Sequence, residues 1–291
     1  MAGNLDDLIF SLADPTPEEL RALRITIAVL GTISVVLGLI VVLTYACFPE
    51  KRKSNTSILI FFHSIVGTAL TASIMIPGYF GEYLEPETGL CYFQAGCFLF
   101  FGMCLMFAWF FITLNLFLRV HLDKEEVPLW IPLSVSLLAA TLVTIIPFAT
   151  GNVKYDGVWC FIDSVNLGMV FGCFYGELIA LTAIGTPLWI VIIWKMTSSL
   201  MATWETQRKT PINENRHLLH VDNPPPTVGQ KEKLLLLVRQ TTFVTGFLII
   251  FYIMVANRLI IFSTGPTFVG WLIHAIGLSS PLSALASPIP E

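Results

Sequence analysis

Seven long apolar runs, separated by shorter polar segments, dominate the chain. They span roughly residues 25–47, 56–80, 91–120, 129–150, 167–194, 234–262 and 268–287. Each run holds about 20 residues or more, and at about 1.5 Å rise per residue such a helix crosses a hydrocarbon core of about 30 Å. Membrane-spanning strands are about 10 residues long and alternate in polarity, so they do not fit this pattern. The pattern predicts an all-α membrane protein, a bundle of seven transmembrane helices.

Composition supports this prediction, and the placement of charge orients the bundle. Hydrophobic residues make up 55% of the chain and charged residues 12%. Twelve Lys and Arg residues lie in or beside the gaps after runs one, three and five, against three on the other side. Because basic loops stay in the cytoplasm, the N-terminus is predicted outside and the C-terminus inside. The predicted parts are an extracellular segment 1–24, the helical domain 25–287 and a long cytoplasmic loop 195–233.

Two of the six cysteines lie at the same depth on the predicted outer face. Cys91 opens the third run, and Cys160 lies between runs four and five. An oxidising compartment permits a disulfide between them, which would tie the second outer loop to the third helix. The other four cysteines lie within apolar runs, where a thiol usually acts as a small apolar side chain.

Ionisable groups inside the apolar runs are costly, so each needs a partner or a function. Arg258, beside Asn257 in the sixth run, either extends to the membrane interface, pairs with a carboxylate, or contacts an anionic ligand. Glu177 in the fifth run is a partner for Arg258, a protonated buried acid or a pocket residue. His274 in the seventh run is either a ligand contact or a satisfied buried histidine.

The second outer loop carries aromatic residues next to a fixed cysteine. Trp159 and Phe161 flank Cys160, and Asp163 follows them. Aromatic side chains in this position either close over a pocket, plug the bundle or anchor the loop at the membrane interface.

Several short motifs resemble one family of receptors. They are Cys91-Tyr92 with Gly102 and Trp109, Gly157-Val158-Trp159-Cys160-Phe161-Ile162, Phe171-Gly172-Cys173-Phe174-Tyr175-Gly176, Val255-Ala256-Asn257-Arg258 and Ile273-His274. With these motifs the chain resembles the cyclic-AMP-receptor-like group of seven-helix G-protein-coupled receptors. The resemblance implies that an extracellular small molecule shifts the bundle to a state that activates a heterotrimeric G protein inside.

The pocket implied by this resemblance is bounded by helices three, five, six and seven and the second outer loop. Its candidate ligand-binding residues are Trp159, Phe161, Asp163, Tyr175, Glu177, Asn257, Arg258 and His274. The ligand's identity stays open, because cyclic AMP is an anion and the predicted outer face is acidic, which makes electrostatic steering unfavourable.

On the predicted inner face, Arg119 ends the third run at a position suited to G-protein contact. The Asp-Arg-Tyr triplet of rhodopsin-like receptors is absent there, where the chain reads Leu118-Arg119-Val120-His121. Asn115, one turn earlier, is a candidate for an interhelical hydrogen bond. The candidate G-protein contacts are Arg119, Lys124, Lys195, Lys231 and Lys233.

The seventh helix is expected to be shortened, which makes a truncated, non-signalling receptor form an alternative. Pro281 should kink this helix, and Pro288 and Pro290 should end it. A membrane transporter or channel is a further alternative, although it would be expected to show internal repeats or several acidic residues in mid-bilayer. A retinal protein needs a lysine in the seventh run, and no lysine follows Lys233.

Enzymatic activity is not expected. The sequence shows no Ser-His-Asp set, metal-ligand spacing or phosphate-binding glycine loop. Neither a cofactor nor a nucleic-acid partner is predicted, and the expected location is the plasma membrane.

Overall fold

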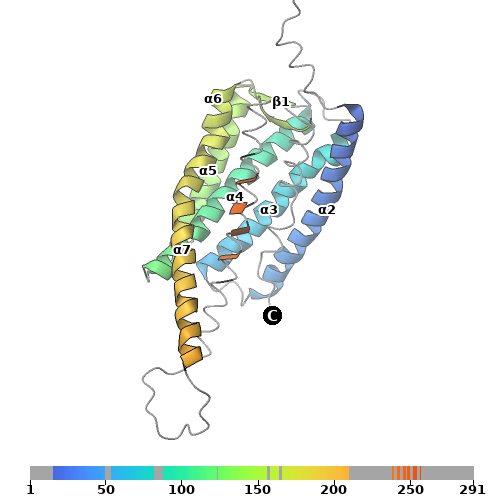
Figure 1. Ribbon diagram of the computed structural model, residues 1–291. Helices are drawn as coiled ribbons and strands as arrows, with labels where there is room; N and C mark the ends of the chain where they lie inside the picture. The colour runs from blue at the N-terminus through green and yellow to red at the C-terminus, as the bar shows by residue number, and fades with distance from the viewer. Residues whose placement is uncertain are drawn as a thin grey trace, which may run out of the picture.

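The computed structural model describes residues 16–49, 54–81, 88–122, 124–155, 158–163 and 166–209, with ten single positions between 238 and 256. Within these residues, five helices are long and apolar enough to cross a membrane. They run side by side along one direction (Figure 1). The sixth and seventh predicted helices fall largely or wholly outside the described residues, so a total of seven stays a prediction.

The elements follow one another in a simple order. They are α2 (Pro17–Cys47), α3 (Asn55–Phe80), α4 (Gly89–His121), α5 (Trp130–Ala149), β1 (Val153–Tyr155), β2 (Cys160–Ile162), α6 (Leu167–Val170), the π-helical turn η3 (Phe171–Tyr175) and α7 (Gly176–Lys209). The two strands form a small antiparallel hairpin at one end of the bundle. We call this the hairpin end, and the end where α4 joins α5 the opposite end.

The first helix starts earlier than its apolar run. A capping box closes its N-terminus: the Glu19 N–H donates to Thr16 Oγ1 (3.3 Å), and the Thr16 N–H donates to Glu19 Oε2 (2.8 Å). Pro17 occupies the first turn, where its missing N–H costs nothing. The helix therefore begins at Pro17 rather than at Ile25. The boundary predicted from hydrophobicity was wrong, because polarity marks the membrane edge and capping marks the helix end.

Small residues bring α2 and α3 close together. Gly31, Ser34 and Gly38 are buried along one face of α2. A Cβ atom at Gly78 of α3 would lie 2.8 Å from the backbone nitrogen of Ala28, so the backbones approach each other directly at this point. Such contacts are typical of helix packing in membranes, where dispersion and close approach replace the hydrophobic effect.

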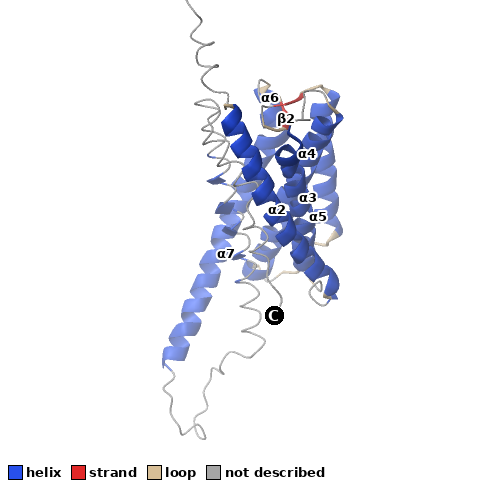
Figure 2. Cartoon of the chain, turned by 90° about the vertical axis from the view of Figure 1, so that its right-hand side faces the viewer, coloured by secondary structure: helices blue, strands red, loops and turns tan. Residues whose placement is uncertain are grey.

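The third helix of the structure, α4, is the centre of the bundle. In its most apolar window 61% of the residues are buried, against 22–39% in the other four long helices. It contacts α3, α5, α7 and both strands, and Figure 2 shows it among the other helices. Its buried residues include Trp109, Leu99 and Met103, which are completely shielded from solvent.

The fifth apolar run forms three segments instead of one continuous α-helix. The π turn η3 lies between α6 and α7, and the Gly176 N–H donates to the Phe171 carbonyl. A side chain at Gly176 would collide with that carbonyl, so the turn requires glycine here. Past the predicted end at Trp194, α7 continues to Lys209 (Figure 1). The start of the predicted loop 195–233 is therefore helical, because helix propensity continues where hydrophobicity falls.

Candidate functional site

The hairpin is fixed to α4 at two points. Cys91 and Cys160 form a disulfide with 5.3 Å between their Cα atoms, which confirms the pairing expected from the sequence. The Cys160 N–H also donates to Oε1 of Gln94, at 2.8 Å. Gln94 lies one helical turn from Cys91 and is 1% exposed, so the hairpin is held against the end of the bundle by a covalent and a buried polar contact.

The two aromatic residues beside Cys160 are packed into the protein. Trp159 is 4% exposed and Phe161 is 3% exposed. The Phe161 ring lies edge-on against Phe98 of α4 and Phe174 of η3, with centroids 5.3 Å apart in both cases. Edge-to-face pairs of this kind stabilise a fixed arrangement. The hairpin thus closes the end of the bundle with an aromatic plug, and neither ring lies exposed at a membrane interface.

Two charged residues of the hairpin region, Lys154 and Asp163, neutralise each other. Lys154 Nζ and Asp163 Oδ2 lie 2.6 Å apart, with side chains 64% and 15% exposed. The carboxylate of Asp163, a candidate ligand contact, thus has a cation from the neighbouring strand beside it. Lys154 is also compensated, which reduces its availability to an anionic ligand.

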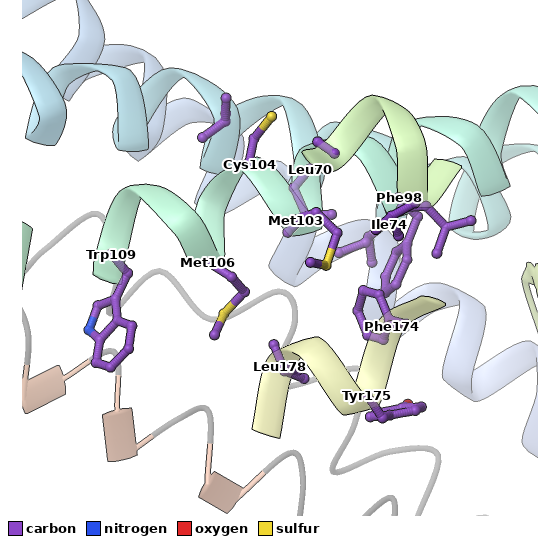
Figure 3. Close-up of a cluster of buried hydrophobic side chains, with 14 of the residues drawn as sticks. Leu70, Ile74, Phe98, Met103, Cys104, Met106, Trp109, Phe174, Tyr175 and Leu178 are labelled. Carbon is purple, nitrogen blue, oxygen red and sulfur yellow. The ribbon is translucent and has the colours of Figure 1, made fainter. Parts of the chain in front are cut away.

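Beneath the plug, mainly apolar side chains pack into a buried cluster, drawn in Figure 3, which we call the apolar cluster. Phe98, Met103 and Met106 come from α4, and Phe174, Tyr175 and Leu178 come from η3 and the start of α7. Tyr175 is therefore close to the aromatic plug, and its ring lies edge-on to Phe174 with centroids 5.2 Å apart. A ligand would enter here only by displacing these packed side chains, and their apolar character favours an apolar ligand body over a highly charged one.

Glu177 is the acidic residue of this region. It stands in the first turn of α7, and its buried Oε2 atom has no hydrogen-bond partner among the residues that the structure describes. A carboxyl oxygen in such a place is a candidate contact for a polar group of a ligand or of another helix. The other candidates, Asn257, Arg258 and His274, lie outside the described residues, so their distances from Glu177 stay open.

At the opposite end, Arg119 is held by a residue that the sequence analysis missed. Its Nη2 atom lies 2.6 Å from Oε1 of Glu126, in the segment that joins α4 to α5. The backbone N–H and Oγ1 of Thr56, at the start of α3, also donate to Glu126, at 3.2 and 3.0 Å. We call Arg119, Glu126 and Thr56 the clamp. In the sequence, the sign of this ion pair was an acidic residue, Glu126, seven positions after Arg119 at the end of the third apolar run.

Further polar contacts surround the clamp. Oδ1 of Asn115 accepts a hydrogen bond from the Val127 N–H (3.0 Å), and Asn55 Nδ2 donates to the Val127 carbonyl (3.1 Å). Among the described residues, Asn115 therefore bonds to a connecting segment rather than to another helix, the partner that the sequence suggested. Lys195 Nζ donates to the His121 carbonyl at the end of α4 (3.3 Å).

Two of the five candidate G-protein contacts thus have local partners in the structure. Arg119 is bound in the clamp, and Lys195 caps the end of α4. Lys124 is exposed at the same end. Lys231 and Lys233 lie outside the described residues.

Comparisons with known proteins point to receptors. The chain is 25% identical over 218 residues to the rat (Rattus norvegicus) "Prostaglandin E2 receptor EP1 subtype" and 28% identical over 157 residues to the mouse (Mus musculus) protein. These matches cover 67% and 49% of this chain, but only 52% and 38% of the two receptors. No protein-family model matches the chain.

The structural match covers more of this chain than the sequence matches do. Squid rhodopsin superposes with a TM-score of 0.61 at 14% sequence identity, over 93% of this chain and 82% of rhodopsin. The chain has a rhodopsin-like fold. Together with the sequence similarity, this makes the protein GPCR-like, a multi-pass protein of the plasma membrane. The similar curated proteins are receptors and not enzymes.

Proposed function

We propose that the protein is a G-protein-coupled receptor, which transmits the binding of an extracellular ligand to a heterotrimeric G protein. The observation that carries the proposal is the sequence similarity to prostaglandin receptors over 67% of the chain. Because the match spans about half of the rat receptor's length, the signalling activity itself belongs to the proposal. The rhodopsin-like fold supports it, as does a bundle whose hairpin end is closed and whose opposite end carries the clamp.

The hairpin end is proposed to face the outside of the cell. Twelve Lys and Arg residues on the other side against three on this one favour that orientation. The Cys91–Cys160 disulfide also favours it, because disulfides persist in oxidising compartments and are rare in the cytosol. In this orientation the clamp lies at the cytoplasmic end, where a G protein would bind.

The proposed ligand is an amphiphile with a large apolar body. Below the plug, the side chains of the apolar cluster include Phe98, Met103, Phe174 and Leu178, and Lys154 is neutralised by Asp163. The similar curated proteins are named as prostaglandin E2 receptors, which agrees with a lipid-derived ligand. The narrower assignment to the cyclic-AMP-receptor-like group rests on the sequence motifs alone and stays a prediction. A cyclic nucleotide would rely on Arg258 as its cation.

The proposed transducer surface combines the clamp with neighbouring basic residues. Arg119 is 41% exposed in its side chain, so a G protein could reach it once Glu126 releases it. Lys124 is exposed nearby and Lys195 contacts the same end of α4. With Lys231 and Lys233, they form the proposed cationic contact region.

Reconstitution with G proteins tests the proposal directly. The full chain is placed in lipid nanodiscs with each class of heterotrimeric G protein, and uptake of a non-hydrolysable GTP analogue is measured. Prostaglandin E2, other oxygenated fatty acids and cyclic AMP are added in separate arms. We expect a fatty-acid-derived ligand to raise uptake in the wild type, and Arg119→Ala to bind that ligand without raising uptake. Ligand binding with no exchange on any G protein would overturn the signalling role, and ligand-driven ion flux into sealed proteoliposomes that contain the chain would favour a transporter or channel.

A further inference from the structure

The N-terminus of α3 carries a serine that directly follows a run of basic residues. Ser54 is the capping residue of this helix, and its Oγ atom accepts a hydrogen bond from the Ser57 N–H (3.1 Å). In the sequence, Lys51, Arg52 and Lys53 come immediately before it. These three lie outside the described residues, and their order and charge follow from the sequence alone. A serine preceded by adjacent cations is a charge pattern that basic-directed protein kinases recognise.

Ser54 lies just outside the helix, where its backbone is extended (φ −105°, ψ 152°) and its side chain is half-buried. A kinase binds its substrate as an extended segment, so the first turn of α3 must open before the reaction. Helix ends open at a lower free energy than helix centres. Two contacts oppose the opening: Thr56 donates to Glu126, and Asn55 Nδ2 donates to the carbonyl of the residue after it (3.1 Å). Both lead to residues 122–129, which join α4 to α5 and which we call the connector.

A phosphate on Ser54 and the carboxylate of Glu126 need the same hydrogen-bond donor. An acceptor at a helix N-cap binds the second and third N–H groups of the helix, which in α3 belong to Thr56 and Ser57. The Ser57 N–H donates to Ser54 Oγ, whereas the Thr56 N–H donates to Glu126 Oε2 (3.2 Å). Because phosphate and carboxylate are both anionic, they also repel each other. The N-terminus of α3 thus favours one of the two anions at a time.

The phosphate is the stronger anion of the two. It carries a charge of about −1.5 to −2 at pH 7, and arginine binds it through two parallel hydrogen bonds. Glu126 Oε1 lies 2.6 Å from Arg119 Nη2 and accepts from Thr56 Oγ1 (3.0 Å), so the guanidinium is already beside the N-terminus of α3. Without its cation, the Glu126 side chain, which is 9% exposed, would be a buried and unpaired charge, which is costly. It would therefore move into solvent and take the connector with it.

We propose that Ser54 is a phosphorylation site for a basic-directed serine kinase, and that the phosphate takes Arg119 from Glu126 and frees the connector from α3. In the reaction, Ser54 Oγ forms a bond to the γ-phosphorus of ATP, and the bond from this phosphorus to the bridging oxygen breaks. ADP leaves, and the hydroxyl proton passes to the catalytic aspartate of the kinase. The proposal rests on the proposed orientation, because ATP and protein kinases are cytoplasmic.

Phosphorylation in nanodiscs tests the site. The full chain is incubated with ATP and the catalytic subunit of cyclic-AMP-dependent protein kinase, which selects serines that follow basic residues, and peptide mass spectrometry locates the phosphate. Both faces of a nanodisc are open to the kinase, so the result depends neither on orientation in cells nor on G-protein coupling. We expect phosphate on Ser54. Glu126→Gln weakens the contact that closes the first turn, and should raise the initial rate about threefold.

A matched pair of variants tests the basic residues. Lys51→Gln with Arg52→Gln should slow phosphorylation of Ser54 about tenfold, equivalent to about 1.4 kcal/mol of recognition. Arg208→Gln with Lys209→Gln removes the same charge at the end of α7 and should not change the rate. Retention of the Cys91–Cys160 disulfide checks the fold of each variant. Equal rates for the two double variants, phosphate on other serines in place of Ser54, or no phosphate in either the wild type or Glu126→Gln would each overturn the site.

Hydrogen exchange tests the effect on the connector. The Val127 N–H donates to Oδ1 of Asn115 (3.0 Å), so its exchange rate reports whether the connector is attached. Phosphorylation should speed this exchange about tenfold, equivalent to about 1.4 kcal/mol, relative to the same protein incubated without ATP. The Cys160 amide, at the hairpin end, should be unaffected, and in Ser54→Ala the addition of ATP should change neither amide. An unchanged Val127 amide in the phosphorylated protein would overturn the release of the connector.

Discussion

Gln94 and Cys160 are joined by a buried hydrogen bond in which the strand backbone donates to the helix side chain over 2.8 Å. This contact lies one turn along α4 from the disulfide at Cys91. Two attachments one turn apart fix both the position and the tilt of the hairpin. The aromatic plug formed by Phe161 depends on that orientation, because its edge-on contacts require a fixed ring position.

Replacing Gln94 by Met should loosen the hairpin while the disulfide stays intact. The Cys160 N–H would lose its acceptor in a buried place, which costs about 1–3 kcal/mol. We expect a lower thermal unfolding midpoint in detergent and faster hydrogen exchange at the Cys160 amide. An unchanged exchange rate would show that the side chain of Gln94 does not hold the strand.

Removing the disulfide should reduce folding yield and delivery to the cell surface. Cys91→Ser and Cys160→Ser each break the same bond, so the double variant should be no worse than either single one. Loss of a native disulfide costs about 2–5 kcal/mol in small secreted domains. Surface expression by flow cytometry measures the effect, with Cys47→Ser, at an exposed free cysteine, as the control. Normal surface expression of the single variants would contradict a structural role for this bond.

Neutralising Glu126 should raise G-protein activation without ligand. Glu126→Gln keeps one oxygen acceptor for Thr56 and removes the charge that holds Arg119. Ion pairs at partly exposed positions contribute up to about 1 kcal/mol, so we expect a rise in basal nucleotide exchange of at most about fivefold. The neighbouring Glu125 is exposed, and Glu125→Gln is the matched control. Basal exchange at or below the wild-type rate would remove the clamp from the mechanism.

A methyl group at Gly78 should separate α2 from α3. Its Cβ atom would lie 2.8 Å from the Ala28 nitrogen, which is too close unless the helices move. Overpacking of this kind costs about 1–3 kcal/mol. Gly78→Ala should therefore lower the thermal unfolding midpoint, whereas Gly89→Ala, which meets nothing within 4 Å, should not. Equal midpoints for the two variants would exclude a tight contact at this crossing.

Arg258 lies outside the described residues, and its expected role comes from the sequence alone. Arg258→Ala should abolish the ligand response and leave surface expression intact, because the guanidinium is expected to bind an acidic or hydrogen-bonding group of the ligand. Ligand-stimulated nucleotide exchange, normalised to surface expression, measures this. A normal response would make Arg258 an interfacial anchor instead.

Within the described residues, hydrophobicity located the five long helices but not all of their ends. The run 56–80 differs from α3 by one residue, because there the capping residue Ser54 lies next to the apolar run. At Pro17 and Lys209 the helices continue into polar sequence, where capping and propensity decide the boundary. The disulfide was predictable, because topology places Cys91 and Cys160 on the same side at the same depth.

The clamp was not predictable to the same extent. Glu126 and Thr56 are 70 positions apart, and their contact depends on how α3 packs beside α4. A sequence shows that both residues are polar and near helix ends, but not the rotation of each helix about its axis. The π turn was not predictable either, because five residues have the same hydrophobicity whether they form a π turn or an α-helical turn.

The π turn at Phe171–Tyr175 is a place where a deletion can be tolerated during evolution. A π turn accommodates one residue more than an α turn over a similar height. Deleting a single residue there would restore ordinary helix geometry and leave α7 below Gly176 in place. The segment above would keep its direction as well, because the π turn absorbs the extra residue, and only the side chains of the turn itself would be rearranged. Loss of one codon would thus change which side chains of Phe171–Tyr175 pack against α4 while the helices on either side stay as they are.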